Sequence, residues 1–182
     1  MLRLGWKCLS MDFLPGGGRL FLSRLKNWIF SSNVSIGEYV RTLRFTEYYH
    51  NNSFHKTGKK INFPYDIMYV FYHRRYMKLS AKLNLEIGLN ACDVGLHLYH
   101  YGCIVNYTAI VGKNVRLHGM NCIGNNDKGV PVIGNNVELG VGASIIGNVH
   151  IADNVRIGAG AVVVKDVLEV GATVVGIPAH SI

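Results

Sequence analysis

The second half of the chain carries an aliphatic residue at every sixth position. The longest unbroken series is Ile133, Leu139, Ile145, Ile151, Ile157 and Val163; shorter series are Val111, Leu117, Ile123 and Leu98, Ile104. A period of six fits neither a helix nor a simple alternating strand, and an antiparallel sandwich does not explain it. It is typical of a solenoid whose triangular coil has three six-residue sides. The pattern therefore predicts a parallel β-helix over residues 85–182, with the aliphatic side chains pointing into a narrow interior.

The repeat is interrupted in two places. Its phase slips between Ile104 and Val111, and again across residues 125–132 (NNDKGVPV). The second interruption is long enough to be a loop that protrudes from the coil, and loops on repeat scaffolds often carry function.

Residues 1–84 show no such repeat. Apolar and aromatic residues at helical spacing predict helices over Gly18–Phe30, Ser35–Tyr49 and Pro64–Leu83. The polar segment His50–Asn62, with Gly58, is predicted to be a linker. We therefore expect two domains, a helical cap (1–84) and a coil (85–182).

Charge divides the chain in the same way. Residues 1–84 carry 14 Lys and Arg against 4 Asp and Glu, whereas residues 85–182 carry 5 against 7. Basic residues among Trp and Phe suggest that the cap rests on an anionic membrane surface, or that its aromatics form a trimer core. Nucleic-acid binding is disfavoured because no recognised motif accompanies the charge.

The cysteines and the apolar stretches of the chain indicate its cellular compartment. Four scattered cysteines without a CxxC pair indicate reduced thiols, a cytoplasmic protein and no metal site. No apolar stretch is long enough for a transmembrane helix, and no signal peptide is expected.

Three segments together resemble the hexapeptide-repeat acyltransferases. These are residues 134–147 (GNNVELGVGASIIG), 158–166 (GAGAVVVKD) and 176–179 (GIPA). The likeness is to the serine acetyltransferase branch and its relatives in capsule and exopolysaccharide gene clusters. It implies a left-handed parallel β-helix, a homotrimer and acetyl-CoA as co-substrate.

The resemblance also points to a catalytic base. In that branch a histidine follows a Gly-aliphatic segment at the start of the coil, and His100 occupies that position in residues 95–102 (GLHLYHYG). An imidazole suits the task because its pKa lies near neutrality. Glu86 is the expected orienting acid and Asp93 the alternative, while His97 and His118 compete with His100 for the role of base.

Binding residues follow from the same resemblance. Small residues at coil corners would hold the pantetheine arm of acetyl-CoA through backbone amides, and Lys165 and His180 would lie near its phosphates. The full expected set is Gly124, Asn125, Gly140, Val141, Ala159, Gly160, Val164, Lys165 and His180. Each glycine, taken singly, is equally well explained by coil geometry.

The acceptor is expected to be a carbohydrate hydroxyl. Serine acetyltransferases resemble one another in an acidic residue before the base and an Arg-His pair before the loop proline, whereas this chain has Tyr99 and Gly129-Val130. A zwitterion would lose both charged partners, each contributing about 1.5–3 kcal/mol. Tyr99, Tyr101, Asn106 and His118 are the expected acceptor-binding residues. Serine O-acetylation is the first alternative, and a non-catalytic structural or partner protein is the second.

Overall fold

The computed structural model describes residues 33–58, 63–126 and 128–182, and side chains from residue 36 onward. The chain divides into two compact units, Met1–Leu83 and Asn84–Ile182, which we describe separately. The predicted helix over Gly18–Phe30 lies outside the described residues.

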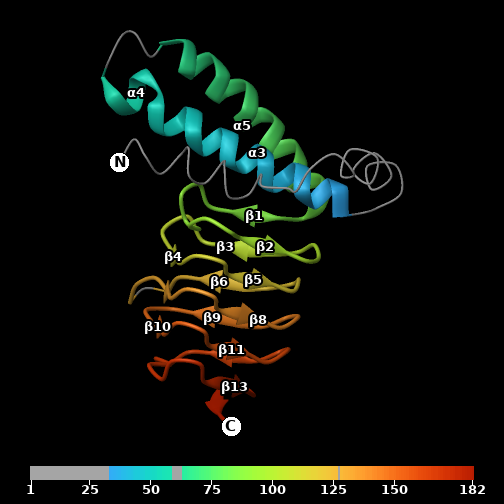
Figure 1. The fold of residues 1–182 in the computed structure, drawn as a ribbon, viewed down its shortest axis with the longest axis vertical. Coiled ribbons are helices and arrows are strands. Elements are labelled where there is room, and N and C mark those ends of the chain that lie inside the picture. The colour runs from blue at the N-terminus through green and yellow to red at the C-terminus, as the bar shows by residue number, and fades with distance from the viewer. Residues whose placement is uncertain (1–32, 59–62, 127) are drawn as a thin grey trace, which may run out of the picture. The chain divides into compact units, whose positions relative to one another are not determined.

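Unit two is a parallel β-helix of short strands stacked coil upon coil (Figure 1). Within the described residues, the strands form three sheets of five, three and six strands, one along each side of the coil. The strands are β1 (Glu86–Ile87), β2 (His97–Leu98), β3 (Ile104–Val105), β4 (Ile110–Val111), β5 (Arg116–Leu117), β6 (Cys122–Gly124), β7 (Val132–Ile133), β8 (Glu138–Leu139), β9 (Ser144–Ile146), β10 (His150–Ile151), β11 (Arg156–Ile157), β12 (Val162–Val163), β13 (Thr173–Val175) and β14 (His180–Ser181). The predicted fold class, mainly β with a left-handed parallel β-helix and N-terminal helices, is confirmed.

Strand register gives the length of each coil. Ile104 pairs with Cys122, 18 residues later, but Cys122 pairs with Ser144, 22 residues later. The four additional residues lie in the predicted loop between β6 and β7. There the backbones of Asn126 and Gly129 hydrogen-bond to each other in both directions at 3.1 Å. The loop is therefore a short turn closed on itself, and Val132, which was predicted to end it, begins β7.

The aliphatic series forms the core. All six residues of the longest series are at most 4% exposed. Ile104, however, is 45% exposed, and its neighbour Val105 points inward. The first slip in phase therefore lies between Leu98 and Val105, earlier than predicted. Leu98 pairs with Leu117, and Val105 pairs with Ile123. The corner after β2 is therefore one residue longer than the corner after β5.

Unit one is a helical hairpin. Its helices are α3 (Asn33–Asn52), α4 (Phe54–Thr57) and α5 (Phe63–Leu83). Aromatic rings pack α3 on α5: Tyr39 meets Tyr76 at 5.5 Å, and Phe45 meets Tyr72 at 5.0 Å. No described helix is long and apolar enough to span a membrane.

The predicted linker His50–Asn62 is partly helical. Helix α3 continues to Asn52, and α4 follows at once because Ser53 caps it by accepting a hydrogen bond from the Lys56 amide. A serine at this position stabilises a helix start that polarity alone does not predict. The N–H of Phe54 donates to Asp66 at 2.8 Å, which ties α4 to α5.

Candidate active site

The outer face of the six-stranded sheet presents two columns of side chains. Because side chains alternate along a strand, the residues on either side of each inward aliphatic face outward. The first column, in register, is His97, Arg116, Glu138, Arg156 and Thr173. The second, joined by backbone hydrogen bonds just after each strand, is Tyr99, His118, Gly140 and Gly158. Two rings thus stand above two glycines.

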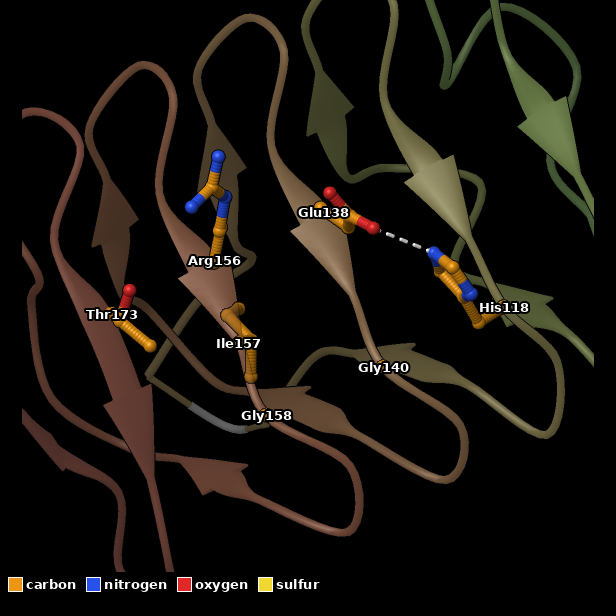
Figure 2. Close-up of a pocket in the computed structure, with 7 residues that line it drawn as sticks. All are labelled: His118, Glu138, Gly140, Arg156, Ile157, Gly158 and Thr173. Atoms are coloured by element: carbon orange, nitrogen blue, oxygen red, sulfur yellow. Dashed lines mark hydrogen bonds and ion pairs between the residues drawn. The ribbon is translucent and has the colours of Figure 1, made fainter.

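Glu138 joins the two columns (Figure 2). Its Oε1 lies 2.8 Å from His118 Nε2, and its Oε2 accepts a hydrogen bond from an Arg116 Nη atom at 2.8 Å. The His118 ring stacks on Tyr99, with centroids 4.6 Å apart and planes at 20°. A carboxylate that binds two donors from the coil above holds both in defined positions.

A shallow hollow of about 410 Å³ lies below the His118 ring. It is lined by His118, Glu138, Gly140, Arg156, Ile157, Gly158 and Thr173. Its floor is backbone, since a Cβ at Gly140 would lie 2.6 Å from the amide nitrogen of Ala159. An extended chain with amide groups, such as pantetheine, fits such a floor.

His100 lies exposed on the lengthened corner between β2 and β3. Gly119 of the next coil packs directly against it: a Cβ at Gly119 would lie 2.7 Å from the His100 Cβ. Gly119 also has a φ of +119°, which side-chain-bearing residues rarely adopt. The His100 corner therefore lies beside the Tyr99–His118 stack.

The structure distinguishes the two candidate orienting acids by their sides of the coil. Glu86 is exposed in β1, on the five-stranded side that follows the His100 corner. Asp93 follows Cys92, which bridges to Val111 on the three-stranded side, away from that corner. The topology favours Glu86, but among the described residues no hydrogen bond joins His100 to either carboxylate. The imidazole–carboxylate pair nearest to the His100 corner is His118–Glu138; a second, His150–Asp166 at 3.6 Å, involves β10 on the three-stranded side.

The predicted cofactor residues fall into two groups. Val141, Ala159 and Gly160 lie with Gly140 on the His100 edge, where the Gly160 amide donates to the Val141 carbonyl at 2.9 Å. The other group borders the far end of the five-stranded side and comprises Gly124, Asn125, Val164 and Lys165.

Of the predicted acceptor residues, Tyr99, Tyr101 and His118 lie at the His100 edge. Asn106 does not: it donates to Asn125 at 3.0 Å, in the far group. The remaining predicted cofactor residue, His180, belongs to neither cofactor group. It is exposed in β14, which runs antiparallel to β13.

Sequence reasoning missed three residues here. Glu138 and Arg116 could not be paired from the sequence, because the inserted turn makes paired strands 22 residues apart there instead of 18. Asn121 is 1% exposed: its Oδ1 accepts from the Gly119 amide, and its Nδ2 donates to the carbonyls of Gly140 and Ala143. A polar residue pointing into the coil gave no recognisable signal in the sequence.

The thiol of Cys103 lies near this site, 3.8 Å from the His100 carbonyl oxygen. Burial raises the pKa of the Cys103 and Cys122 thiols, which disfavours the nucleophilic thiolate. Among residues 33–58, 63–126 and 128–182, no group of three or more His, Cys, Asp or Glu is placed to hold a metal ion.

The β-helical part of the chain is similar to known proteins. The family described as bacterial transferase hexapeptide (six repeats) matches residues 131–165. A probable serine acetyltransferase of Oryza sativa is 46% identical over 85 residues, which are 44% of this chain and 27% of that protein. The Synechococcus elongatus serine acetyltransferase is 41% identical over 93 residues, which are 48% of this chain and 38% of that protein. The matches thus span less than two fifths of these relatives.

A solved structure agrees with the sequence relatives. The crystal structure of a serine acetyltransferase from Brucella abortus aligns with 81% of this chain and 56% of its own, at a TM-score of 0.61 and 27% identity. The coil is a hexapeptide-repeat β-helix that is similar to serine acetyltransferases in sequence and fold.

Proposed function

We propose, because the coil carries the hexapeptide repeat of bacterial transferases, that this protein transfers the acetyl group of acetyl-CoA to an acceptor hydroxyl. The likeness of the coil to serine acetyltransferases, at 41% to 46% identity, carries the proposal. The exposed imidazole of His100 beside a glycine-floored hollow supports it.

His100 is proposed as the general base. Its ring nitrogen takes the proton of the acceptor hydroxyl while that oxygen attacks the thioester carbonyl carbon. The carbon–sulfur bond breaks, and the imidazolium returns the same proton to the departing thiolate of CoA. Glu86 is the proposed orienting acid, since it lies on the side of the coil that follows the His100 corner.

The hollow is the proposed place of the pantetheine arm. Acetyl-CoA supplies the acyl group as an activated thioester. Gly140 and Gly158 carry no side chain, so an extended chain can lie close to the backbone there, and Val141, Ala159 and Gly160 continue the same edge. The far group, with Lys165, borders the opposite end of the five-stranded side. We propose that it meets the first group only across a subunit boundary in a homotrimer, where Lys165 and His180 approach the phosphates.

L-Serine is the first candidate acceptor. It is the acceptor that the names of the similar proteins imply. The comparisons support this alternative better than the carbohydrate acceptor predicted from the sequence.

A carbohydrate hydroxyl is the second candidate, and one observation favours it. Tyr99 is 44% exposed and stacks on His118 beside His100, so the site presents an aromatic surface of the kind that packs against sugar rings. The interaction of the basic N-terminal region with a membrane stays a prediction.

The test is release of CoA from acetyl-CoA by the purified full chain, first with L-serine and then with a panel of oligosaccharides. We expect His100→Ala to lower the rate at least 100-fold, the usual loss when a general base is removed. His150→Ala is the matched control, because His150 is an exposed histidine in β10, on the three-stranded side.

The outcomes separate the candidates. Release with serine identifies a serine acetyltransferase, and release with sugars alone identifies the second candidate. Failure to bind acetyl-CoA would leave the non-catalytic alternative, and an equal loss in both variants would exclude His100 as the base.

A further inference from the structure

The Tyr99–His118 stack is not an isolated ring contact. Arg116 and His118 both bind the carboxylate of Glu138, one oxygen each, and His118 in turn stacks on Tyr99. This series of contacts crosses three successive coils. The proposed mechanism does not use it.

The series ends where an acceptor would lie. Tyr99 immediately precedes His100, and Gly119, immediately after His118, packs against the His100 Cβ. Below the rings lies the glycine-floored hollow, of which His118 and Glu138 form one end. The His118 ring therefore borders both the His100 corner and the hollow.

The stack also has polar atoms left for a ligand. Among the described residues, neither the Tyr99 hydroxyl nor the Nδ1 atom of His118 has a hydrogen-bond partner, whereas Nε2 is held by Glu138. The side chain of His118 is 33% exposed and that of Glu138 is 29% exposed. A fixed imidazole with one open nitrogen, beside a phenol, suits an acceptor that carries several hydroxyl or other polar groups.

We propose that Glu138 is a positioning residue for the acceptor. By binding Arg116 and His118 together, it holds the Tyr99–His118 stack as a fixed wall beside His100, and this wall orients the acceptor hydroxyl toward the base. The proposal rests on the proposed acetyl transfer, and it predicts a larger effect of these residues on acceptor affinity than on acetyl-CoA affinity. Positioning of this kind matters because small misplacements of reacting groups lower rates strongly.

Steady-state kinetics of Glu138→Ala test the proposal, with acetyl-CoA and whichever of L-serine or the oligosaccharides the wild type accepts. We expect the KM for the acceptor to rise about tenfold, and the KM for acetyl-CoA to rise clearly less, although Glu138 also lines one end of the hollow. Glu138→Gln keeps an oxygen for His118 but loses the ion pair with Arg116, so its effect should be intermediate. Tyr99→Phe keeps the ring and should stay closer to wild type than Tyr99→Ala.

The matched control is Glu169→Ala, which removes an exposed carboxylate of the β-helix that does not line the hollow. A double variant Tyr99→Ala/Glu138→Ala should raise the acceptor KM by less than the product of the single effects, since both act through His118.

A second readout does not need activity. In the wild type the Tyr99 ring should shift the His118 imidazole proton signals upfield in the NMR spectrum, and Glu138→Ala should abolish most of that shift. Retention of the shift would show that Glu138 does not hold the stack and would overturn the proposal, even if the variant were less stable.

The outcomes distinguish the two proposals. If the wild type transfers acetyl groups and His100→Ala does not, an unchanged acceptor KM in Glu138→Ala and Glu138→Gln overturns this inference alone. Equal increases in both KM values would mean a general structural role and would also overturn it. If the wild type accepts no acceptor at all, the proposed function and this inference fall together.

Discussion

Asn121 shows how one buried side chain fixes the geometry of the candidate site. Its amide satisfies an N–H of Gly119 and the carbonyls of Gly140 and Ala143 inside the coil. Gly119 contacts His100, and Gly140 floors the hollow. The same residue therefore links the His100 corner and the hollow.

We expect Asn121→Leu to destabilise the coil by about 1–3 kcal/mol, because the Gly119 N–H loses its acceptor and the carbonyls of Gly140 and Ala143 each lose one of two donors. Thermal unfolding followed by circular dichroism measures the change. Asn148→Leu, at an exposed asparagine, is the control and should change the Tm little. Equal Tm values for both variants would show that Asn121 is not a structural residue.

At the scale of elements, the helical hairpin packs through aromatic rings together with the buried aliphatic side chains of Ile36 and Leu43. Tyr49 stacks on Tyr72 at 5.3 Å, and the His50 ring lies 5.0 Å from Tyr69. A histidine within such a cluster makes hairpin stability depend on pH, since burial penalises its charged form.

We expect the hairpin to lose stability as the pH falls from about 7.5 to 5.5. Burial, followed by the nearby charges of Lys56 and His73, lowers the pKa of His50 below its usual value. The unfolded chain therefore binds the proton more readily, so this contribution is complete above the usual histidine pKa of about 6.5 and declines below it.

Thermal melts at 222 nm, at both pH values, measure this effect because the helices dominate that signal. His50→Gln should show a smaller difference between the two pH values than the wild type. His55→Gln, at an exposed histidine of α4, is the control. An unchanged pH dependence in His50→Gln would contradict the expectation.

At the scale of the whole molecule, the coil offers faces rather than a deep pocket. The predicted cofactor residues lie at opposite ends of the five-stranded side, and the hollow is shallow. Near the far group, Ile104, Tyr107 and Ile110 are 45%, 76% and 60% exposed. Exposed apolar residues gathered near site residues are typical of a subunit interface.

We expect light scattering to give a mass of three times the 20.2 kDa of one chain. Ile104→Glu should weaken the trimer and reduce acetyl transfer with it, because a charge would be buried at the interface. Leu168→Glu, at an exposed position in the last coil, is the control. A fully active monomer would refute the trimer.

The candidate site was only partly predictable, and particular residues show why. His100 could be proposed as the base from the sequence because a local motif surrounds it. Glu138 could not, because its contact with His118 depends on the four residues inserted between β6 and β7, which shift the register between coils. Asn106 was grouped with Tyr99 as an acceptor residue, yet the two lie at different ends of one side.

The sequence by itself determined the β-helix, because burial of one aliphatic residue in six is a local and repeated requirement that the chain displays directly. It also determined which small residues form the corners. Only the tertiary structure decided which corners and columns meet: that Val105 rather than Ile104 points inward, that the His100 corner is one residue longer, and that Arg116, Glu138, His118 and Tyr99 form one series of contacts. These depend on register between coils, which is set by insertions and corner lengths acting across many residues and not by the pattern within any one repeat.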